Sequence, residues 1–209
     1  MEIKDRIVNY WTKRSESFAK LRHEELHSYM SDLWLTEILK YLPTKPCKIL
    51  DVGTGSGFFA QLLAKHHHEV DGIDLTHSMI EQAKLSLKQL SDYNSKINFQ
   101  VMDAENLTYA DNSFDVVISR NLTWTLPNPQ KAYSEWYRVL KPNGILLNFD
   151  ADYGNEQFYQ QTPQQLPPNH AHLSVQPQLM QECDLIKNSL EISHKLRPQW
   201  DLHILKQLQ

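Results

Sequence analysis

The chain has 209 residues, with 25 acidic and 21 basic side chains that give a net charge of −4 at pH 7. This acidic balance argues against a nucleic-acid-binding protein, whose contact surface would be strongly basic. The length is sufficient for a complete hydrophobic core, and we expect residues 1–209 to form a single domain.

The sequence carries no signal for export or for membrane insertion. Cys47 and Cys183 are its two cysteines, too few for a disulfide framework, which favours a reducing compartment. Lys4, Asp5 and Arg6 interrupt the start of the chain, where a signal peptide would be apolar. No window approaches the roughly 20 apolar residues of a membrane-spanning helix. We therefore expect a cytoplasmic protein with no membrane partner.

Residues 1–44 are predicted to form helices, the first of which combines aromatic and charged side chains. Tyr10, Trp11 and Arg14 stand out among them. Two interpretations are open for this segment. It is either a helical cover whose aromatic side chains pack on the rest of the domain, or a lid that closes over a ligand site.

Residues 48–60, KILDVGTGSGFFA, predict a buried strand, a glycine-rich turn and a helix. In α/β sheets this sequence of elements presents a nucleotide site. Asp51 lies inside the apolar strand, where an acid is costly unless something specific binds it. The dinucleotide fingerprint needs a third glycine where this chain has Phe58. The spacing therefore disfavours a nicotinamide or flavin oxidoreductase, which is one alternative function.

Three consecutive histidines, His66, His67 and His68, follow the predicted helix and suggest a metal site. Adjacent residues on a helix point about 100° apart, so three in a row cannot converge on one ion. We expect a solvated helix end here and no metal site.

An acid also marks the end of the next predicted strand, residues 69–75. Asp74 lies 17 residues after Gly57, close to the offset of an acid that accepts hydrogen bonds from ribose hydroxyls. Its alternative role is to cap the helix that follows.

Three more strands are predicted over residues 97–101, 114–119 and 145–149. Residues 120–124, RNLTW, follow the second of these, and Tyr153 follows the third. Because open α/β sheets bind ligands at the carboxyl ends of their strands, we expect these residues to lie near a ligand site.

The pattern G-x-G-x-G, with an acid two residues before the first glycine, resembles the glycine loop of class I S-adenosylmethionine-dependent methyltransferases. The blocks FDVVISRNLTWTL and VLKPNGILLNFD resemble the equivalent blocks of small-molecule methyltransferases. The resemblance covers roughly residues 45–152, which would form the cofactor-binding core. It implies an α/β fold with a Rossmann-like open sheet, mostly parallel, with helices on both faces and an N-terminal helical lid.

The resemblance also implies roles for individual residues around bound S-adenosylmethionine. Asp74 would bind the ribose, Met79 would contact the adenine, and Asp103 would accept a hydrogen bond from the adenine amino group. A core methionine and a loop-capping acid are the alternatives for the last two. The expected cofactor-binding residues are Asp51, Gly53, Thr54, Gly55, Gly57, Asp74, Leu75, Met79, Asp103, Ala104, Asn121 and Leu122. Substrate or lid contacts are expected from Tyr10, Trp11, Arg14, Trp124 and Tyr153.

Methyl transfer is an in-line displacement in which the cofactor supplies the reactive group, so no metal or nucleophilic side chain is required. No catalytic residue is assigned. Residues 121–124 read Asn-Leu-Thr-Trp instead of the Asn-Pro-Pro-aromatic tetrad of nucleobase and glutamine methylation, which favours a small-molecule acceptor. The alternative is a subunit that binds the cofactor but is catalytically silent.

Residues 153–209 form the C-terminal part. Residues 155–181 contain eight Gln and four Pro with little apolar periodicity, which predicts a surface excursion, and a helix is expected near the C-terminus. The family's sheet continues with two further strands, which the sequence up to Gln209 does not provide. The strand over residues 145–149 would then be an exposed edge. We expect a homodimer to cover it, or else the chain's own C-terminal part.

Overall fold

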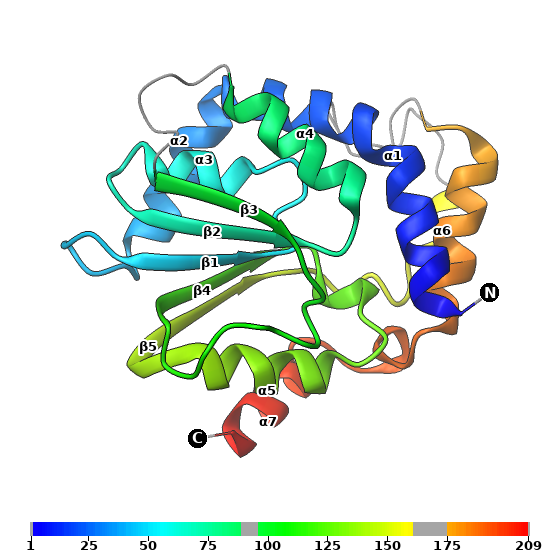
Figure 1. The fold of residues 1–209 in the computed structure, drawn as a ribbon. Coiled ribbons are helices and arrows are strands. Elements are labelled where there is room, and N and C mark those ends of the chain that lie inside the picture. Colours follow the sequence, from blue (N-terminus) through cyan, green and yellow to red (C-terminus); the bar gives the residue numbers. More distant parts are fainter. Residues whose placement is uncertain (1, 89–95, 161–174, 209) are drawn as a thin grey trace.

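Five parallel strands form the sheet of this computed structural model, which describes residues 2–88, 96–160 and 175–208 (Figure 1). The strands are β1 (Lys48–Val52), β2 (Glu69–Asp74), β3 (Ile97–Val101), β4 (Phe114–Arg120) and β5 (Leu140–Phe149). Their spatial order is β3-β2-β1-β4-β5, and every neighbouring pair is parallel. The predicted Rossmann-like α/β architecture with an open sheet is confirmed.

The two inner strands β1 and β4 consist largely of buried apolar residues, as expected for a parallel sheet that is covered on both faces. Ile49, Leu50 and Val52 of β1 have no solvent exposure. The chain passes from β1 to β2 on one side and later enters β4 on the other side of β1. The order therefore reverses between β1 and β4, and open sheets bind ligands outside the carboxyl ends of the strands at such a point.

Helices cover both faces of the sheet (Figure 1). One face carries α2 (Tyr29–Leu39), α3 (Phe58–Ala64) and α4 (His77–Leu87), and the other carries α5 (Pro129–Val139) and α7 (Gln199–Gln207). The apolar core on the first face is built around Phe59 and Leu63, and the core on the second around Tyr133 and Trp136. In the described parts of the chain, no helix combines the length and apolarity that crossing a membrane requires.

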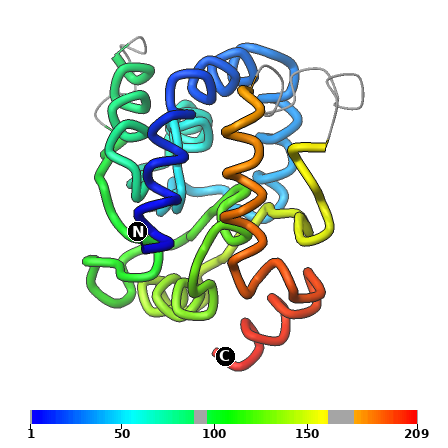
Figure 2. Tube along the Cα trace, turned by 90° about the vertical axis from the view of Figure 1, so that its right-hand side faces the viewer, coloured from blue at the N-terminus to red at the C-terminus, as the bar shows by residue number. Residues whose placement is uncertain are grey.

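The helices α1 (Ile3–Leu26) and α6 (Pro177–Ser189) run side by side across the end of the sheet where the strands terminate (Figure 2). Arg6 of α1 forms an ion pair with Glu182 of α6, with 3.0 Å between Nε and Oε1. Tyr10 packs in one apolar cluster with Cys183 and Ile186 of α6. The predicted N-terminal helix is therefore present as a cover, and its action as a lid stays a prediction.

The expectation of an irregular Gln- and Pro-rich segment is wrong for its C-terminal part. The helix α6 begins at Pro177 and buries Met180, Cys183 and Ile186. Proline fits the first turn of a helix, because its missing N–H has no helical partner there. The apolar residues recur every three positions, a helical spacing that the intervening polar residues conceal. Residues 161–174 of the same segment lie outside the described residues.

The expected solvated helix end is wrong for His68. The helix α3 ends at Ala64, and His68 is buried after the turn that follows. Its Nδ1 accepts a hydrogen bond from the backbone N–H of Cys47 at 3.2 Å. Burial, together with the neighbouring His66 and His67, lowers the pKa of His68, which favours the neutral form that can accept this bond.

The strand β5 begins earlier than predicted, because Leu140 already pairs with β4. Phe114 pairs with Leu140 and Val116 with Ile145, and this register shift accommodates the extra residues of β5. Within the described residues β5 pairs with β4 alone, so its outer side is a strand edge. The homodimer expected to cover that edge stays a prediction.

We predict that Gly57→Ala destabilises the fold by about 1–3 kcal/mol, through a left-handed backbone and overpacking. Gly57 has φ +83°, and a Cβ there would lie 2.6 Å from the Phe99 ring. Urea unfolding measures the loss, and Gly55→Ala is the matched control. Gly55 also has positive φ, but a Cβ added there would lie 3.4 Å from its nearest neighbour, an atom of the Phe18 ring. Equal losses of unfolding free energy in both variants would show that the contact with Phe99 does not cause the destabilisation.

Candidate functional site

A cavity opens at the carboxyl ends of the central strands, below α1. It is lined by the glycine loop after β1, by the ends of β2, β3 and β4, and by one face of α1. This is the place where the order of the strands reverses. The geometry of the sheet therefore brings the polar ends of several strands to a single cavity.

The glycine loop forms the floor of the cavity at Gly53 and Gly55. Both residues have positive φ, +69° and +54°, which glycine adopts without a steric penalty. A Cβ on Gly53 would lie 2.8 Å from the Leu122 side chain, so that position must stay small. A Cβ on Gly55 would meet only the Phe18 ring within 4 Å. Gly55 thus presents its backbone to the cavity and allows a ligand to approach closely.

Asp74 joins the glycine loop to the end of β2. One carboxylate oxygen accepts the N–H of Gly55 at 3.1 Å, and the other accepts the N–H of Thr76 at 2.8 Å. Each oxygen can accept about two hydrogen bonds, so both retain capacity for donors from a ligand in the cavity. Burial raises the pKa of Asp74, and the two backbone N–H groups oppose that rise. The bond to Thr76 fixes the residue that precedes α4 and leaves a ligand-binding role open.

Asp51 lies deeper, between β2 and β4. Its side chain is buried and accepts a hydrogen bond from the Thr54 hydroxyl at 2.6 Å. Burial raises the pKa of Asp51 to about 7, although the Thr54 hydroxyl stabilises the ionised form. Together with Asp74 it gives the cavity floor an acidic character that suits a cationic ligand group.

Asp103, after β3, is held by a lysine that the sequence analysis did not identify. Lys4 of α1 lies 2.6 Å from Asp103 Oδ2 and 2.6 Å from Glu105 Oε2. The other oxygen of Asp103 accepts the N–H of Glu105 at 2.9 Å, so the loop-capping role expected as an alternative is present. These contacts tie the start of α1 to the rim of the cavity.

The structure brings almost all of the predicted cofactor residues together. Those that line the cavity are Asp51, Gly53, Thr54, Gly55, Asp74, Leu75, Met79, Asp103, Ala104, Asn121 and Leu122. Gly57 does not line it, because that glycine precedes α3 and packs against Phe99. Of the predicted substrate or lid residues, Trp11, Trp124 and Tyr153 line the cavity, whereas Tyr10 and Arg14 do not.

Tyr10 and Arg14 are buried but do not line the cavity, and Tyr10 belongs to the apolar cluster shared with α6. The face of α1 that does line the cavity carries Lys4, Ile7, Trp11, Phe18 and Arg22. These positions are spaced by three, four, seven and four residues, which is the spacing of one helix face. That periodicity was the signal that could have identified Lys4, Phe18 and Arg22 from the sequence.

An aromatic wall, formed by Trp124, Tyr153 and Phe158, closes one side of the cavity. The Trp124 and Tyr153 ring centroids are 5.1 Å apart, and each lies 5.8 Å from that of Phe158. The indole N–H of Trp124 donates to the carbonyl of Asn121 at 2.9 Å. The wall is therefore fixed to the turn that follows β4.

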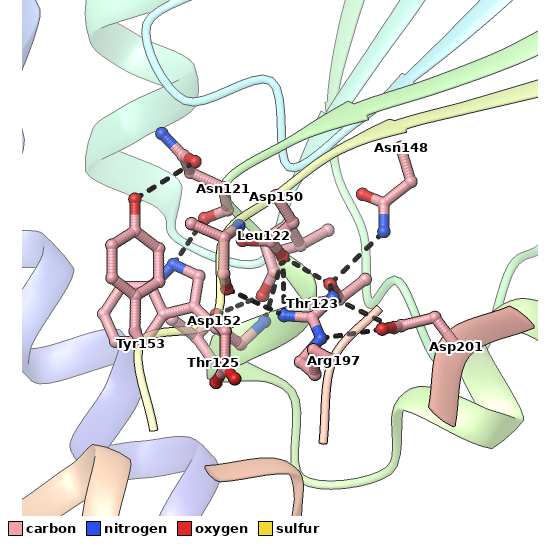
Figure 3. Close-up of polar contacts among 12 residues, drawn as sticks. Asn121, Leu122, Thr123, Thr125, Asn148, Asp150, Asp152, Tyr153, Arg197 and Asp201 are labelled. Carbon is pink, nitrogen blue, oxygen red and sulfur yellow. Dashed lines mark hydrogen bonds and ion pairs between the residues drawn. The ribbon is translucent and has the colours of Figure 1, made fainter. Parts of the chain in front are cut away.

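A buried network behind this wall ties it to the C-terminal part of the chain (Figure 3). Arg197, which precedes α7, donates to both oxygens of Asp201 at 2.9 Å and to the hydroxyl of Thr123 at 2.6 Å. Its Nη1 lies 3.4 Å from Asp150. Asp150 in turn accepts the N–H of Trp124 at 3.1 Å and the hydroxyl of Thr123. Residues after β5 thus position the short 3-10 helix η2 (Thr123–Thr125), which carries Trp124.

The described residues hold no group of three or more His, Cys, Asp or Glu side chains that could bind a metal ion. The chemistry of the cavity therefore rests on carboxylates, backbone groups, guanidinium groups and aromatic rings. Such a set binds and orients a polar organic molecule.

Comparison with known proteins gives a family match for the core of the chain. Residues 50–148 match the family model described as "Methyltransferase domain". This segment contains the glycine loop and the strands β2, β3 and β4 that build the cavity.

Curated relatives match the same part of the chain. One is the ubiquinone biosynthesis O-methyltransferase of Coxiella burnetii, 34% identical over 113 residues, covering 54% of this chain and 47% of the relative. Another is the ubiquinone/menaquinone biosynthesis C-methyltransferase UbiE of Rickettsia akari, 40% identical over 124 residues, covering 56% and 50%. The chain thus spans about half the length of these relatives. Among solved structures, the PH0226 protein of Pyrococcus horikoshii OT3 is 32% identical, with a TM-score of 0.54 and 61% of each chain covered.

We predict that Arg197→Met destabilises the protein by about 3–5 kcal/mol, because Asp150 and Asp201 lose their buried cationic partner. The surface ion pair removed by the control Arg6→Met should contribute at most about 1 kcal/mol. Chemical unfolding of both variants measures the difference. A loss of stability in Arg197→Met no larger than that in Arg6→Met would contradict a structural role for the network around Arg197.

The stability of the Arg197→Met variant is also predicted to depend on pH. Burial already raises the pKa of Asp150 in the presence of Arg197, and loss of the guanidinium raises that pKa further. When a carboxyl has a higher pKa in the folded protein than in the unfolded chain, it stabilises the fold at pH values below its unfolded-state pKa. This contribution is lost as the pH rises through the folded-state pKa. The stability gap between Arg197→Met and wild type should therefore widen from acidic to neutral pH. A difference in stability that narrows toward neutral pH would contradict the role of Arg197 as the cationic partner of Asp150.

Proposed function

We propose that this chain is a class I S-adenosylmethionine-dependent methyltransferase that transfers a methyl group to a small-molecule acceptor. Residues 50–148 match the family model described as "Methyltransferase domain". One observation carries this proposal. The glycine loop and the Asp74 carboxylate are hydrogen-bonded to each other, and both line the cavity at the strand ends. A backbone cradle joined to an acid at the end of the next strand is the arrangement that holds a nucleoside.

The residues in the cavity fit S-adenosylmethionine. Gly55 lines the cavity without a side chain, which lets a ligand approach its backbone, and the remaining acceptor capacity of Asp74 suits the ribose hydroxyls. Leu75, Met79 and Ala104 supply apolar contacts for the adenine, and Asp103 an acceptor for its amino group. We propose that these residues hold the cofactor as the sequence analysis expected.

In the reaction, the bound cofactor supplies a methyl group activated by its sulfonium. The chain's own contribution is to bind, orient and exclude water. Asp51 and Asp74 line the floor of the cavity. Burial raises the pKa of both, and a cationic ligand group beside them would favour their ionised forms and be stabilised by them. The aromatic wall and Trp11 cover the opposite side with apolar surface, where an acceptor would be held away from solvent.

Two features support a small-molecule acceptor. The cavity is lined by one face of α1 and by the aromatic wall, so an acceptor would lie between apolar side chains. The two curated relatives are named as O- and C-methyltransferases of quinone biosynthesis, so the acceptor atom differs between them and is not carried over to this chain. The alternative of a catalytically silent subunit is not favoured by these matches.

We propose in addition a single domain for residues 1–209, a cytoplasmic location and a homodimer through the edge of β5. The reducing environment follows from two unpaired, buried cysteines, Cys47 and Cys183. The edge of β5, which has no further strand partner within the described residues, supports the proposed dimer.

Asp74→Asn is expected to weaken binding of S-adenosylhomocysteine ten- to hundredfold, the scale of one or two lost charge-assisted hydrogen bonds. The variant keeps the shape of the side chain but removes its charge and half of its acceptor capacity. Calorimetry measures the change, and Asp71→Asn, on the same strand but outside the cavity, is the control. Equal affinities for wild type and a folded Asp74→Asn protein would exclude the ribose role, and absence of binding by wild type would exclude the proposed function.

For α1, we predict that S-adenosylhomocysteine slows hydrogen exchange over residues 5–20. The physical reason is that Trp11 and Phe18 line the cavity, so a ligand beneath them adds contacts that the helix must break to open. Exchange–mass spectrometry measures the effect, with α5 on the far face as the internal reference. Unchanged exchange in α1 at saturating ligand would leave the helix as fixed packing and end the lid hypothesis.

A further inference from the structure

Two histidines lie one helical turn apart at the C-terminal end of α1. Residues 23–27 read His-Glu-Glu-Leu-His, and the side chains of His23 and His27 are both exposed. His27 directly follows the last residue of α1 and continues its hydrogen-bonding pattern, because its backbone N–H donates to the carbonyl of His23 at 3.3 Å. Positions i and i+4 are neighbours on the surface of a helix. The two imidazole rings therefore lie on one face of the helix.

The separation of the two rings suits the binding of one metal ion by both. Imidazole nitrogens bind metal ions at about 2.0–2.1 Å, which places the centroids of two rings on the same ion roughly 4.5–5 Å apart. The ring centroids of His23 and His27 are 4.3 Å apart, and their planes are tilted by 45°. The backbone thus already holds the rings close to the spacing of a chelate.

A hydrogen bond determines the tautomer of His27. Its Nδ1 lies 2.8 Å from the backbone carbonyl oxygen of His23, and a carbonyl can only accept, so Nδ1 carries the proton and donates. In the neutral ring the free lone pair is then on Nε2. Histidines that bind metals in proteins typically donate their other ring nitrogen to a carbonyl or a carboxylate, which orients the ring and raises its basicity. His27 is therefore in the form that a metal ion requires.

The turn that carries the two histidines is fixed on its other side. Glu25 lies between them in the sequence and forms ion pairs with Arg22, at 2.6 Å, and with Arg120 at the end of β4, at 2.9 Å. Leu26 is buried in the core on the first face of the sheet. Because this turn is already ordered, an ion that binds to it pays little conformational entropy. The carbonyl end of the helix dipole also favours a bound cation.

The same five residues match the motif H-E-x-x-H of zinc metalloproteases. The protease reaction needs a third protein ligand, and across residues 2–88, 96–160 and 175–208 no group of three His, Cys, Asp or Glu side chains could hold an ion. Neither histidine lines the cavity at the strand ends. The geometry therefore supports binding of an ion by two protein ligands, with water in its remaining positions, and does not support hydrolysis.

We propose that His23 and His27 form a two-ligand site for a divalent transition-metal ion at the C-terminal end of α1. Imidazole ligands suit Zn²⁺, Ni²⁺ and Cu²⁺, whereas Ca²⁺ and Mg²⁺ prefer oxygen ligands. An ion held by both rings links two positions one turn apart, so it stabilises the last turn of the helix whose other residues line the cavity. The site goes beyond the proposed function and does not depend on it.

Calorimetric titration with NiCl₂ and with ZnCl₂, in a non-coordinating buffer at neutral pH, tests the site. Wild type is compared with His23→Gln and His27→Gln, each of which removes one ligand. The matched control is His203→Gln, because His203 is also exposed on a helix but has glutamine four residues before and after it. All three positions are exposed, and thermal unfolding verifies that the variants are folded before metal is added.

We expect wild type and His203→Gln to bind the ion with the same affinity, and His23→Gln and His27→Gln each to bind it about tenfold more weakly or worse. Loss of even an outer partner of a metal ligand typically costs that much, so loss of a ligand should cost no less. Hydrogen exchange–mass spectrometry supplies a second readout. The ion should slow exchange in residues 23–28 of wild type but not of His27→Gln.

The site is excluded if wild type binds neither ion, or if either single variant at His23 or His27 keeps the affinity of wild type. Equal weakening in His203→Gln would also exclude it, because the ion would then be held by scattered surface histidines. Exchange in residues 23–28 that does not respond to a saturating ion in wild type would contradict the stabilisation of the helix end.

Discussion

The partly buried carboxylate of Asp74 is the constraint on which the cavity depends. An acid at the end of an inner strand must find hydrogen-bond donors, and it finds them in the backbone of Gly55 and Thr76. The bond to Gly55 fixes the loop after β1 against the end of β2, and the positive φ of the loop glycines makes that path available. The cradle and the acid therefore form one unit, and the parallel register of β1 and β2 sets their separation.

Cover for this unit comes from parts of the chain that are distant in sequence. The helix α1 contributes one face to the cavity and uses another to pack on α6 (Figure 2). Lys4, near its start, pairs with Asp103 at the rim of the cavity, and Arg22, near its end, pairs with Glu25 of the same helix. The network of Arg197 and Asp150 fixes the turn that carries Trp124 (Figure 3). The floor is thus built by local sequence and the cover by long-range contacts.

That division explains how much the sequence could predict. The glycine loop, Asp74 and Asp103 were predicted because spacing within short segments determines their positions at the strand ends. Tyr10 and Arg14 were expected near the ligand but do not line the cavity, because α1 also packs on α6, whose helical spacing is hidden among glutamines. Contacts between Arg120 and Glu25 join residues 95 positions apart, and no local pattern indicates such a pair.

The central claim is that the cavity at the ends of β1, β2 and β4 holds an adenosyl cofactor. A crystal structure of the protein with S-adenosylhomocysteine tests it most directly. The account predicts the ribose hydroxyls within hydrogen-bond distance of the Asp74 carboxylate, with the adenine between Met79 and Asp103. Density for the nucleoside at any other place, or an empty cavity at saturating ligand, would contradict the account.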